Sequence, residues 1–99
     1  MAEHATVIDV SRYSPAPGKR EELLAAMREL ASMASQAPGC FGAQACSSDR
    51  DATVLVAISR WESQEALDSF ADSSGFETRA EQLTPLLAGP VDREHYRPV

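Results

Sequence analysis

Asp9 and Trp61 are the two side chains whose type and place in the sequence best suit chemistry on a small molecule. Asp9 stands inside residues 6–13 (TVIDVSRY), a run of strand-forming residues in which an acid is unusual. A carboxylate in a partly apolar cleft gains affinity for a proton, so Asp9 is a candidate catalytic base. The alternative role is an ion pair within the sheet, with an arginine such as Arg12 or Arg97.

Trp61 ends a run of β-branched and apolar residues and offers a planar ring with a single N–H donor. Such a ring can stack on a planar aromatic ligand, which makes Trp61 a second candidate for a binding site. The alternative is an aromatic core residue at the end of a strand, because tryptophan is highly buried on average.

The histidines and cysteines do not follow a metal-binding pattern. His95 neighbours Glu94, but no further His or Cys stands at ligand spacing, and His4 lies near the N-terminus. Cys40 and Cys46 fall in one expected strand, where their Cα atoms would be about 20 Å apart, too far for a disulfide. We therefore expect free thiols and no metal.

The length and charge of the chain limit its organisation and its partners. Ninety-nine residues suffice for one domain over 1–99. A net charge of −6 disfavours nucleic acid and anionic membrane surfaces as partners, because both require cationic contacts. The N-terminal MAEHATVIDV has neither the basic start nor the long apolar run of a secretion signal or a membrane helix. We expect a cytoplasmic protein.

Hydrophobic periodicity predicts four strands and two main helices, separated by polar, Gly and Pro clusters. The expected strands are residues 6–13, 40–47, 53–61 and 91–96, the expected helices are 19–36 and a second one capped by Ser63 and reaching Ala71, and 76–87 is an irregular helical piece. The order β-α-β-β-α-β predicts an α+β, ferredoxin-like fold, with a four-stranded antiparallel sheet and both helices on one face.

The third expected strand is apolar on both of its faces. One set of alternating side chains is Leu55, Ala57, Ser59 and Trp61, and the other is Val54, Val56 and Ile58. Because the helices cover only one face, we expect the other to pack against a second copy in a two-fold homodimer. Small residues beside one large aromatic suit a cleft. We therefore expect the Leu55 set to face a cleft between the two sheets and the Val54 set to face the helices, although the inverse assignment is also open.

Several short motifs resemble one known family over nearly the whole chain. They are Pro38-Gly39-Cys40, Arg60-Trp61-Glu62-Ser63 followed by Glu65-Ala66-Leu67, and then Phe76 and Gly89-Pro90. This succession resembles the antibiotic biosynthesis monooxygenase (ABM) family of dimeric α+β barrels. The resemblance implies a small cytoplasmic homodimer with a pocket between sheet and helices in each protomer. It further implies one of several activities: cofactor-independent oxidation of phenolic polyketide rings to quinones with O₂, quinol oxygenation, haem degradation, or no established reaction.

The resemblance also assigns individual residues. Trp61 stands where the polyketide oxygenases have a pocket tryptophan, and Arg79 lies near the position of an arginine that could stabilise an oxyanion. Arg79 could equally lie on a solvated surface. Ala57 and Leu67 replace an asparagine and a tyrosine of those enzymes. The expected catalytic set is Asp9, Trp61 and Arg79, and the expected substrate-binding set is Val7, Leu55, Ala57, Ser59, Leu67 and Phe70.

Three functions follow from these expectations. The first is a cofactor-independent monooxygenase that acts on a small phenolic or polyketide-like substrate with O₂. The second is a non-catalytic binding or accessory dimer, since the asparagine and the tyrosine are missing. The third, haem degradation, is disfavoured, because the positions that the haem-degrading branch gives to an asparagine, a tryptophan and an axial histidine hold Asp9, Phe70 and Arg79 here.

Overall fold

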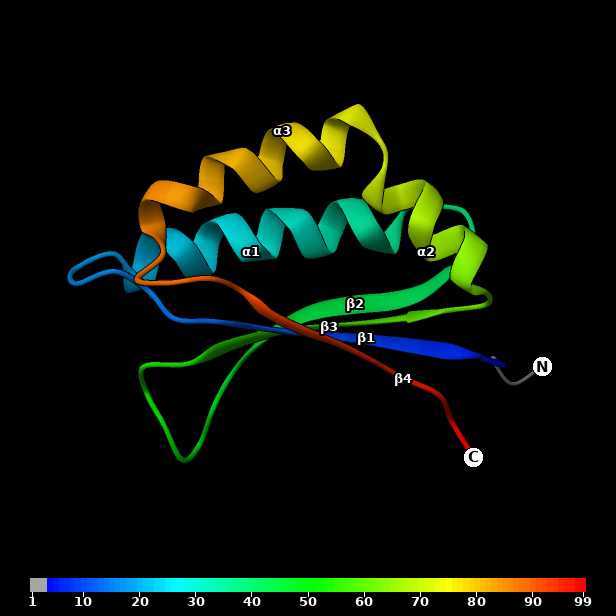
Figure 1. Cartoon of the computed structure of the whole chain (residues 1–99), viewed down its shortest axis with the longest axis horizontal. Coiled ribbons are helices and arrows are strands. Elements are labelled where there is room, and N and C mark those ends of the chain that lie inside the picture. The colour runs from blue at the N-terminus through cyan, green and yellow to red at the C-terminus, as the bar shows by residue number, and fades with distance from the viewer. Residues whose placement is uncertain (1–3) are drawn as a thin grey trace.

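The computed structural model describes residues 4–99 as one antiparallel sheet covered by helices on one side (Figure 1). Residues 1–3 lie outside the described residues. They begin the N-terminal segment that we expected to be neither a secretion signal nor a membrane helix. The elements in chain order are β1 (Val7–Tyr13), α1 (Arg20–Ser35), β2 (Cys40–Ser47), β3 (Leu55–Trp61), α2 (Gln64–Ala71), α3 (Ser74–Leu83), the short 3₁₀ helix η1 (Thr84–Leu86) and β4 (Asp92–Tyr96). The strand order β2-β3-β1-β4 confirms the predicted ferredoxin-like α+β fold.

Most element boundaries lie within one residue of the prediction, and the two larger differences have local causes. β3 begins at Leu55 rather than at residue 53, because the carboxylate of Asp51 accepts hydrogen bonds from the backbone N–H and the hydroxyl of Thr53 and keeps this residue in the turn. Residues 74–83 form the regular helix α3 instead of an irregular piece. Ser73 caps it by accepting from the N–H of Phe76, just as Ser63 caps α2.

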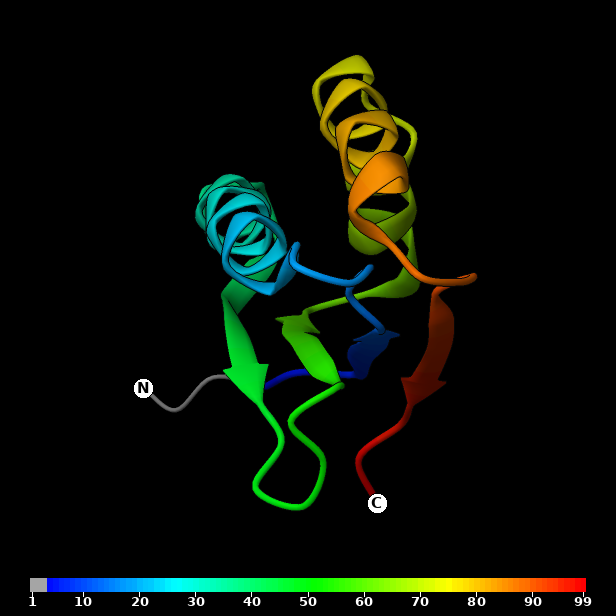
Figure 2. The same cartoon turned by 90° about the vertical axis from the view of Figure 1, so that its left-hand side faces the viewer.

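The helices leave one face of the sheet bare. Figure 2 shows α1, α2 and α3 on the same side of the four strands. α1 forms the main contact with the sheet through a stripe of buried residues at helical spacing, Leu23, Met27, Leu30 and Ala34. On the opposite face the apolar side chains of β1 and β3, Ile8, Val10, Val56 and Ile58, are only half-buried.

The set of β3 side chains that faces the helices is the reverse of the predicted one. Leu55 and Trp61 are fully buried and pack beneath the helices, and Ala57 and Ser59 share their face by alternation. Val56 and Ile58 therefore lie on the bare face, and Val54 precedes the strand. The prediction was wrong because Trp61, the largest side chain of the strand, and Leu55 are needed to fill the space between sheet and helices.

Gly39 sets the close approach of α2 to the sheet. Its φ of +82° belongs to the left-handed region, and a Cβ at this position would lie 2.6 Å from the Cβ of Ala66 in α2. Its carbonyl accepts a hydrogen bond from the backbone N–H of Glu62, at the end of β3. The glycine of the Pro-Gly-Cys motif thus fixes the junction at which Trp61 is buried.

Candidate active site

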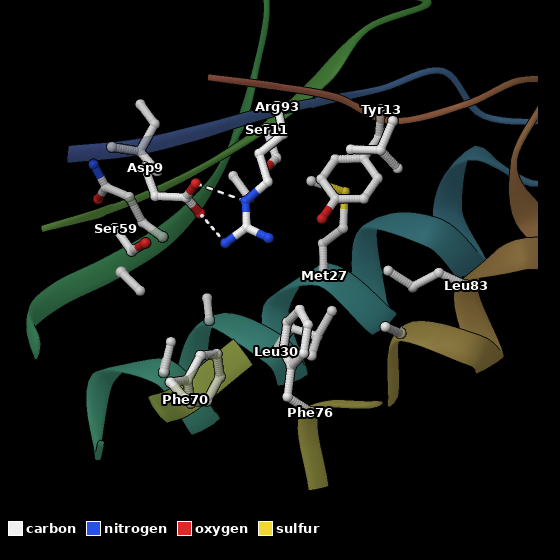
Figure 3. A pocket seen from close by; sticks show the side chains of 18 of the residues that line it. Asp9, Ser11, Tyr13, Met27, Leu30, Ser59, Phe70, Phe76, Leu83 and Arg93 are labelled. Atoms are coloured by element: carbon white, nitrogen blue, oxygen red, sulfur yellow. Dashed lines mark hydrogen bonds and ion pairs between the residues drawn. The ribbon is translucent and has the colours of Figure 1, made fainter. Parts of the chain in front are cut away.

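A cavity of about 330 Å³ lies between the sheet and the helices (Figure 3). Its sheet side carries Asp9, Ser11, Tyr13, Ala57, Ser59, Trp61 and Arg93, and its helical side carries apolar residues that include Met27, Leu30, Ala34, Leu67, Phe70 and Phe76. The volume is at the lower end of the range for small-molecule sites, and a largely apolar wall with a few convergent polar groups is typical of them. The arrangement is that of a site for a small, mostly apolar ligand.

Three aromatic rings follow one another along one side of this cavity. The ring centroids of Trp61 and Phe70 are 5.5 Å apart, and those of Phe70 and Phe76 are 5.1 Å apart, in both cases with the rings tilted. Such tilted contacts are favourable between aromatic side chains and hold the rings in a fixed arrangement. They give the cavity a preformed aromatic wall against which a planar ligand can pack.

Asp9 lies on the sheet floor at the centre of a small charged cluster. Its Oδ1 accepts from Arg93 Nε at 2.8 Å and lies 3.0 Å from His95 Nε2, and its Oδ2 lies 3.4 Å from Arg93 Nη2. Antiparallel pairing of β1 with β4 places His95 opposite Asp9 and Arg93 opposite Ser11. The ion pair is therefore with Arg93 rather than with Arg12 or Arg97, the partners considered from the sequence.

Trp61 is fully buried, and its N–H group has a partner inside the protein. The indole Nε1 donates to Ser59 Oγ at 2.8 Å, within β3 and on the same face. The ring contributes to the cavity wall, but its only polar group is engaged with Ser59 rather than offered to a ligand. Trp61 thus combines the two roles that the sequence left open, core aromatic and cavity wall.

Tyr13 is a cavity residue that sequence reasoning did not select. Burial raises the pKa of its phenol above the ordinary value of 10.0; the carboxylate of Asp9 raises it further, while Arg93 and a hydrogen bond with Ser11 lower it. The net direction is upward, so the phenol stays protonated and can donate a hydrogen bond at neutral pH. Alternation along β1 placed Tyr13 on the same face as Asp9, which was the signal available in the sequence.

We expect a spectrophotometric titration to show this shift directly. The chain has two tyrosines, so Tyr96→Phe leaves Tyr13 as the only phenol. Its ionisation midpoint should lie above 10.0 in the folded protein and return to the ordinary value in denaturant. Because the folded state then holds this proton more tightly than the unfolded state, Tyr13 lowers stability as the pH rises from the unfolded to the folded midpoint. A folded midpoint at or below 10.0 would contradict the burial of this group.

Three predicted site residues do not reach the cavity. Arg79 is exposed on α3 and forms an ion pair with Glu29 of α1, so the expected convergence of Asp9, Trp61 and Arg79 was wrong. Val7 and Leu55 are fully buried in the two core clusters instead of lining the cavity. The remaining predicted residues, Asp9, Ala57, Ser59, Trp61, Leu67 and Phe70, all line it.

Arg93 is the guanidinium that the cavity contains. It comes from β4, an edge strand in which every residue is exposed and no hydrophobic alternation marks a face. The sequence therefore gave no local signal for it, and only the register with β1 brings it beside Asp9. Among residues 4–99 no cluster of three or more His, Cys, Asp and Glu side chains is arranged to hold a metal ion. Over the same residues, no helix combines the length and the apolar character needed to cross a membrane.

Comparisons with known proteins place this architecture. The family model described as antibiotic biosynthesis monooxygenase matches residues 6–82. Rv0793 from Mycobacterium tuberculosis is 25% identical, with a TM-score of 0.87 and 96% of each chain covered. A conserved protein from Methanosarcina mazei Go1 is 18% identical, with a TM-score of 0.88 and coverage of 96% of this chain and 94% of that one.

A third solved structure carries the family's own name. It is a candidate antibiotic biosynthesis monooxygenase from Caulobacter crescentus CB15, 22% identical, with a TM-score of 0.86 and coverage of 96% of this chain and 91% of that one. The comparison with curated proteins gave no match. At these identities the two structures below 25% show a shared fold, and the family match over most of the chain carries the classification.

Proposed function

This chain belongs to the antibiotic biosynthesis monooxygenase family, and from that membership we propose that it oxygenates a small aromatic substrate with O₂, without a metal or flavin. The observation that carries the proposal is the cavity, which joins an aromatic wall to one polar corner. A cofactor-free oxygenase must hold an electron-rich substrate anion away from water while O₂ reacts with it. A mostly apolar chamber with a few polar groups suits that task.

The proposed reaction requires no reactant other than the substrate and O₂. In an anthrone-type phenol a ring carbon that carries two hydrogens becomes a carbonyl with one atom of O₂, and the second oxygen atom leaves as water with both hydrogens. The substrate supplies all four electrons, so no external reductant is required. The substrate ring would pack against Phe70 and Phe76, with its oxygen directed to the sheet floor near Tyr13 and Arg93.

Asp9 receives a positioning role in this proposal. Both of its oxygens face Arg93, and Oδ1 also faces His95, so most acceptor positions of the carboxylate are engaged within the protein. Its position instead holds the guanidinium against the floor of the cavity. Ser59 acts in a similar way on Trp61, by fixing the orientation of the ring that forms part of the wall.

A second candidate function is a binding or accessory protein without catalysis. Ala57 and Leu67 both line the cavity, at the two positions where the resemblance led us to expect an asparagine and a tyrosine. The cavity therefore lacks two polar groups that could orient a substrate or oxygen. A cavity of this kind can still bind a small aromatic molecule, because most of its wall is apolar.

Oxygen uptake separates the two functions. With anthrone-type phenols the purified protein should consume O₂ in proportion to product, with no added metal, flavin or reductant. Dialysis against a chelator should leave the rate unchanged, and Phe76→Ala should raise KM by removing part of the aromatic wall. Binding of the phenols without O₂ uptake across the panel would favour the accessory function instead.

We also propose that the protein works as a cytoplasmic homodimer formed through the bare face of the sheet. The resemblance to this family implies a dimer, and Ile8, Val10, Val56 and Ile58 leave a half-buried apolar surface on that face. An isologous contact between two such faces would cover it on both protomers. In this arrangement each cavity lies on the helical side of its own sheet, so the dimer contact and the site are on opposite faces.

A further inference from the structure

The polar corner of the cavity offers many hydrogen-bond donors and few acceptors. Arg93 and Tyr13 both line it, and a guanidinium and a protonated phenol are donors at neutral pH. Ser11 is a neighbour of both on the sheet: it lies opposite Arg93 in the register of β1 and β4, and it precedes Tyr13 by two residues in β1. The main acceptor nearby is the carboxylate of Asp9, which is already engaged with Arg93 and His95.

Arg93 uses only one edge of its guanidinium to bind Asp9. Of the five N–H groups of a guanidinium, those that face Asp9 are Nε–H and one on Nη2, which leaves three. These three have no other hydrogen-bond partner among residues 4–99. In Figure 3 the guanidinium lies between Asp9 and Tyr13 and faces the helical wall that carries Leu30 and Phe76.

Asp9 holds the guanidinium in this orientation without closing it off. The bond from Arg93 Nε is 2.8 Å long, and the Asp9 side chain is only 13% exposed, so the contact is a partly buried and directional one. The charge of Asp9 is balanced on one edge of Arg93, and the other edge remains available to an acceptor from the cavity. The Arg93 side chain is 38% exposed, so these donors are open to water in the free protein, and a ligand that covers them must offer an acceptor oxygen to avoid leaving them unpaired.

We propose that Arg93, positioned by Asp9 and assisted by Tyr13, is an oxyanion-binding site, and that the cavity's ligand is an aromatic molecule carrying a carboxylate or phenolate oxygen. The site selects an ionised ligand over a neutral one of the same shape. This inference rests on the proposed function, since it names the class of substrate for the same cavity. It can be tested by binding alone and does not require turnover.

Isothermal titration calorimetry at pH 7 with two matched probes tests the proposal. The probes are 2-naphthoate, which is ionised, and 2-naphthamide, which has nearly the same shape and no charge. The wild-type protein should bind the acid at least about tenfold more tightly than the amide. Arg93→Gln should weaken binding of the acid by about tenfold to a hundredfold, the range for a charge-assisted hydrogen bond, and should leave binding of the amide nearly unchanged.

Arg79→Gln is the matched control, because it removes the same charge from an arginine that pairs with Glu29 outside the cavity. It should alter neither affinity by more than about twofold. Tyr13→Phe should weaken binding of the acid more than that of the amide. Comparison of 2-naphthoate with ionised 2-naphtholate at higher pH distinguishes a carboxylate from a phenolate as the preferred ligand oxygen.

The proposal is overturned if wild-type protein binds acid and amide equally, if it binds 2-naphthoate not at all, or if Arg93→Gln lowers both affinities by the same factor. If Arg93→Gln fails to fold, two other measurements decide whether the proposal holds. They are the ratio of acid to amide affinity in the wild-type protein, and binding of the acid by Arg93→Lys, which keeps the positive charge but loses the second donor edge of the guanidinium. Arg93-dependent acid binding without O₂ uptake would refute the monooxygenase and leave this inference standing. If Arg93→Gln oxidises phenols at an unchanged rate, this inference is refuted and the monooxygenase proposal stands.

Discussion

Trp61→Ala is expected to lower the free energy of unfolding by about 3–5 kcal/mol, the usual cost of truncating a buried tryptophan. The ring is fully buried and packs with Val7, Ala34 and Leu67 in one core cluster. Truncation also leaves Ser59 without the N–H that donates to its hydroxyl. Because small domains are stable by only about 5–15 kcal/mol, this variant should be close to unfolding. Urea denaturation followed by circular dichroism measures the loss.

This cost determines how Trp61 can be tested for a role in the site. Loss of activity in Trp61→Ala would reflect a damaged core, so it cannot identify a ligand contact. Trp61→Phe keeps an aromatic ring in the wall but removes the N–H together with part of the bulk of the indole, while Ser59→Ala keeps the indole, removes the acceptor of its N–H and should cost about 1–3 kcal/mol. Both should retain ligand binding, since the indole N–H does not face the ligand. A loss below about 1 kcal/mol in Trp61→Ala would contradict the central packing of this residue.

The fold was predictable because its signals are local. The change of period between β3 and α2, the cap at Ser63 and the Pro-Gly break after α1 each act within a few residues, and the structure has all three. The face of β3 that the helices cover was not predictable from local pattern. Both sets of its side chains are apolar enough to be buried, and the choice depends on which set fits the volume beneath α1.

The candidate site was predictable in part for a similar reason. Asp9 and Trp61 stood out because an acid inside a strand and a tryptophan at its end are unusual in themselves, and both line the cavity. Arg93 did not, because a charged residue on an exposed edge strand is ordinary. The resemblance placed Arg79 at the position of the family's arginine only to within one residue. One residue along a helix turns a side chain by about 100°, which is enough to move it from the cavity to the surface.

Val10→Lys is expected to convert the proposed homodimer into a folded monomer at micromolar concentration. Val10 lies at the centre of the bare face, between Ile58 of β3 and Glu94 of β4. In a two-fold interface the substitution occurs twice, so two desolvated ammonium groups would be brought close together. Such like-charge contacts cost several kcal/mol, which corresponds to an increase of about a hundredfold or more in the dissociation constant. Sedimentation equilibrium measures that change.

Thr78→Lys provides the matched control, because it adds the same charge on the exposed surface of α3, away from the bare face. It should leave the dimer intact. The cavity lies on the other side of the sheet from Val10, so a folded Val10→Lys monomer should still bind 2-naphthoate with an affinity close to that of the wild type. A wild-type protein that sediments as a stable monomer would refute the dimer, and the half-buried valines and isoleucines of that face would then require a different cover.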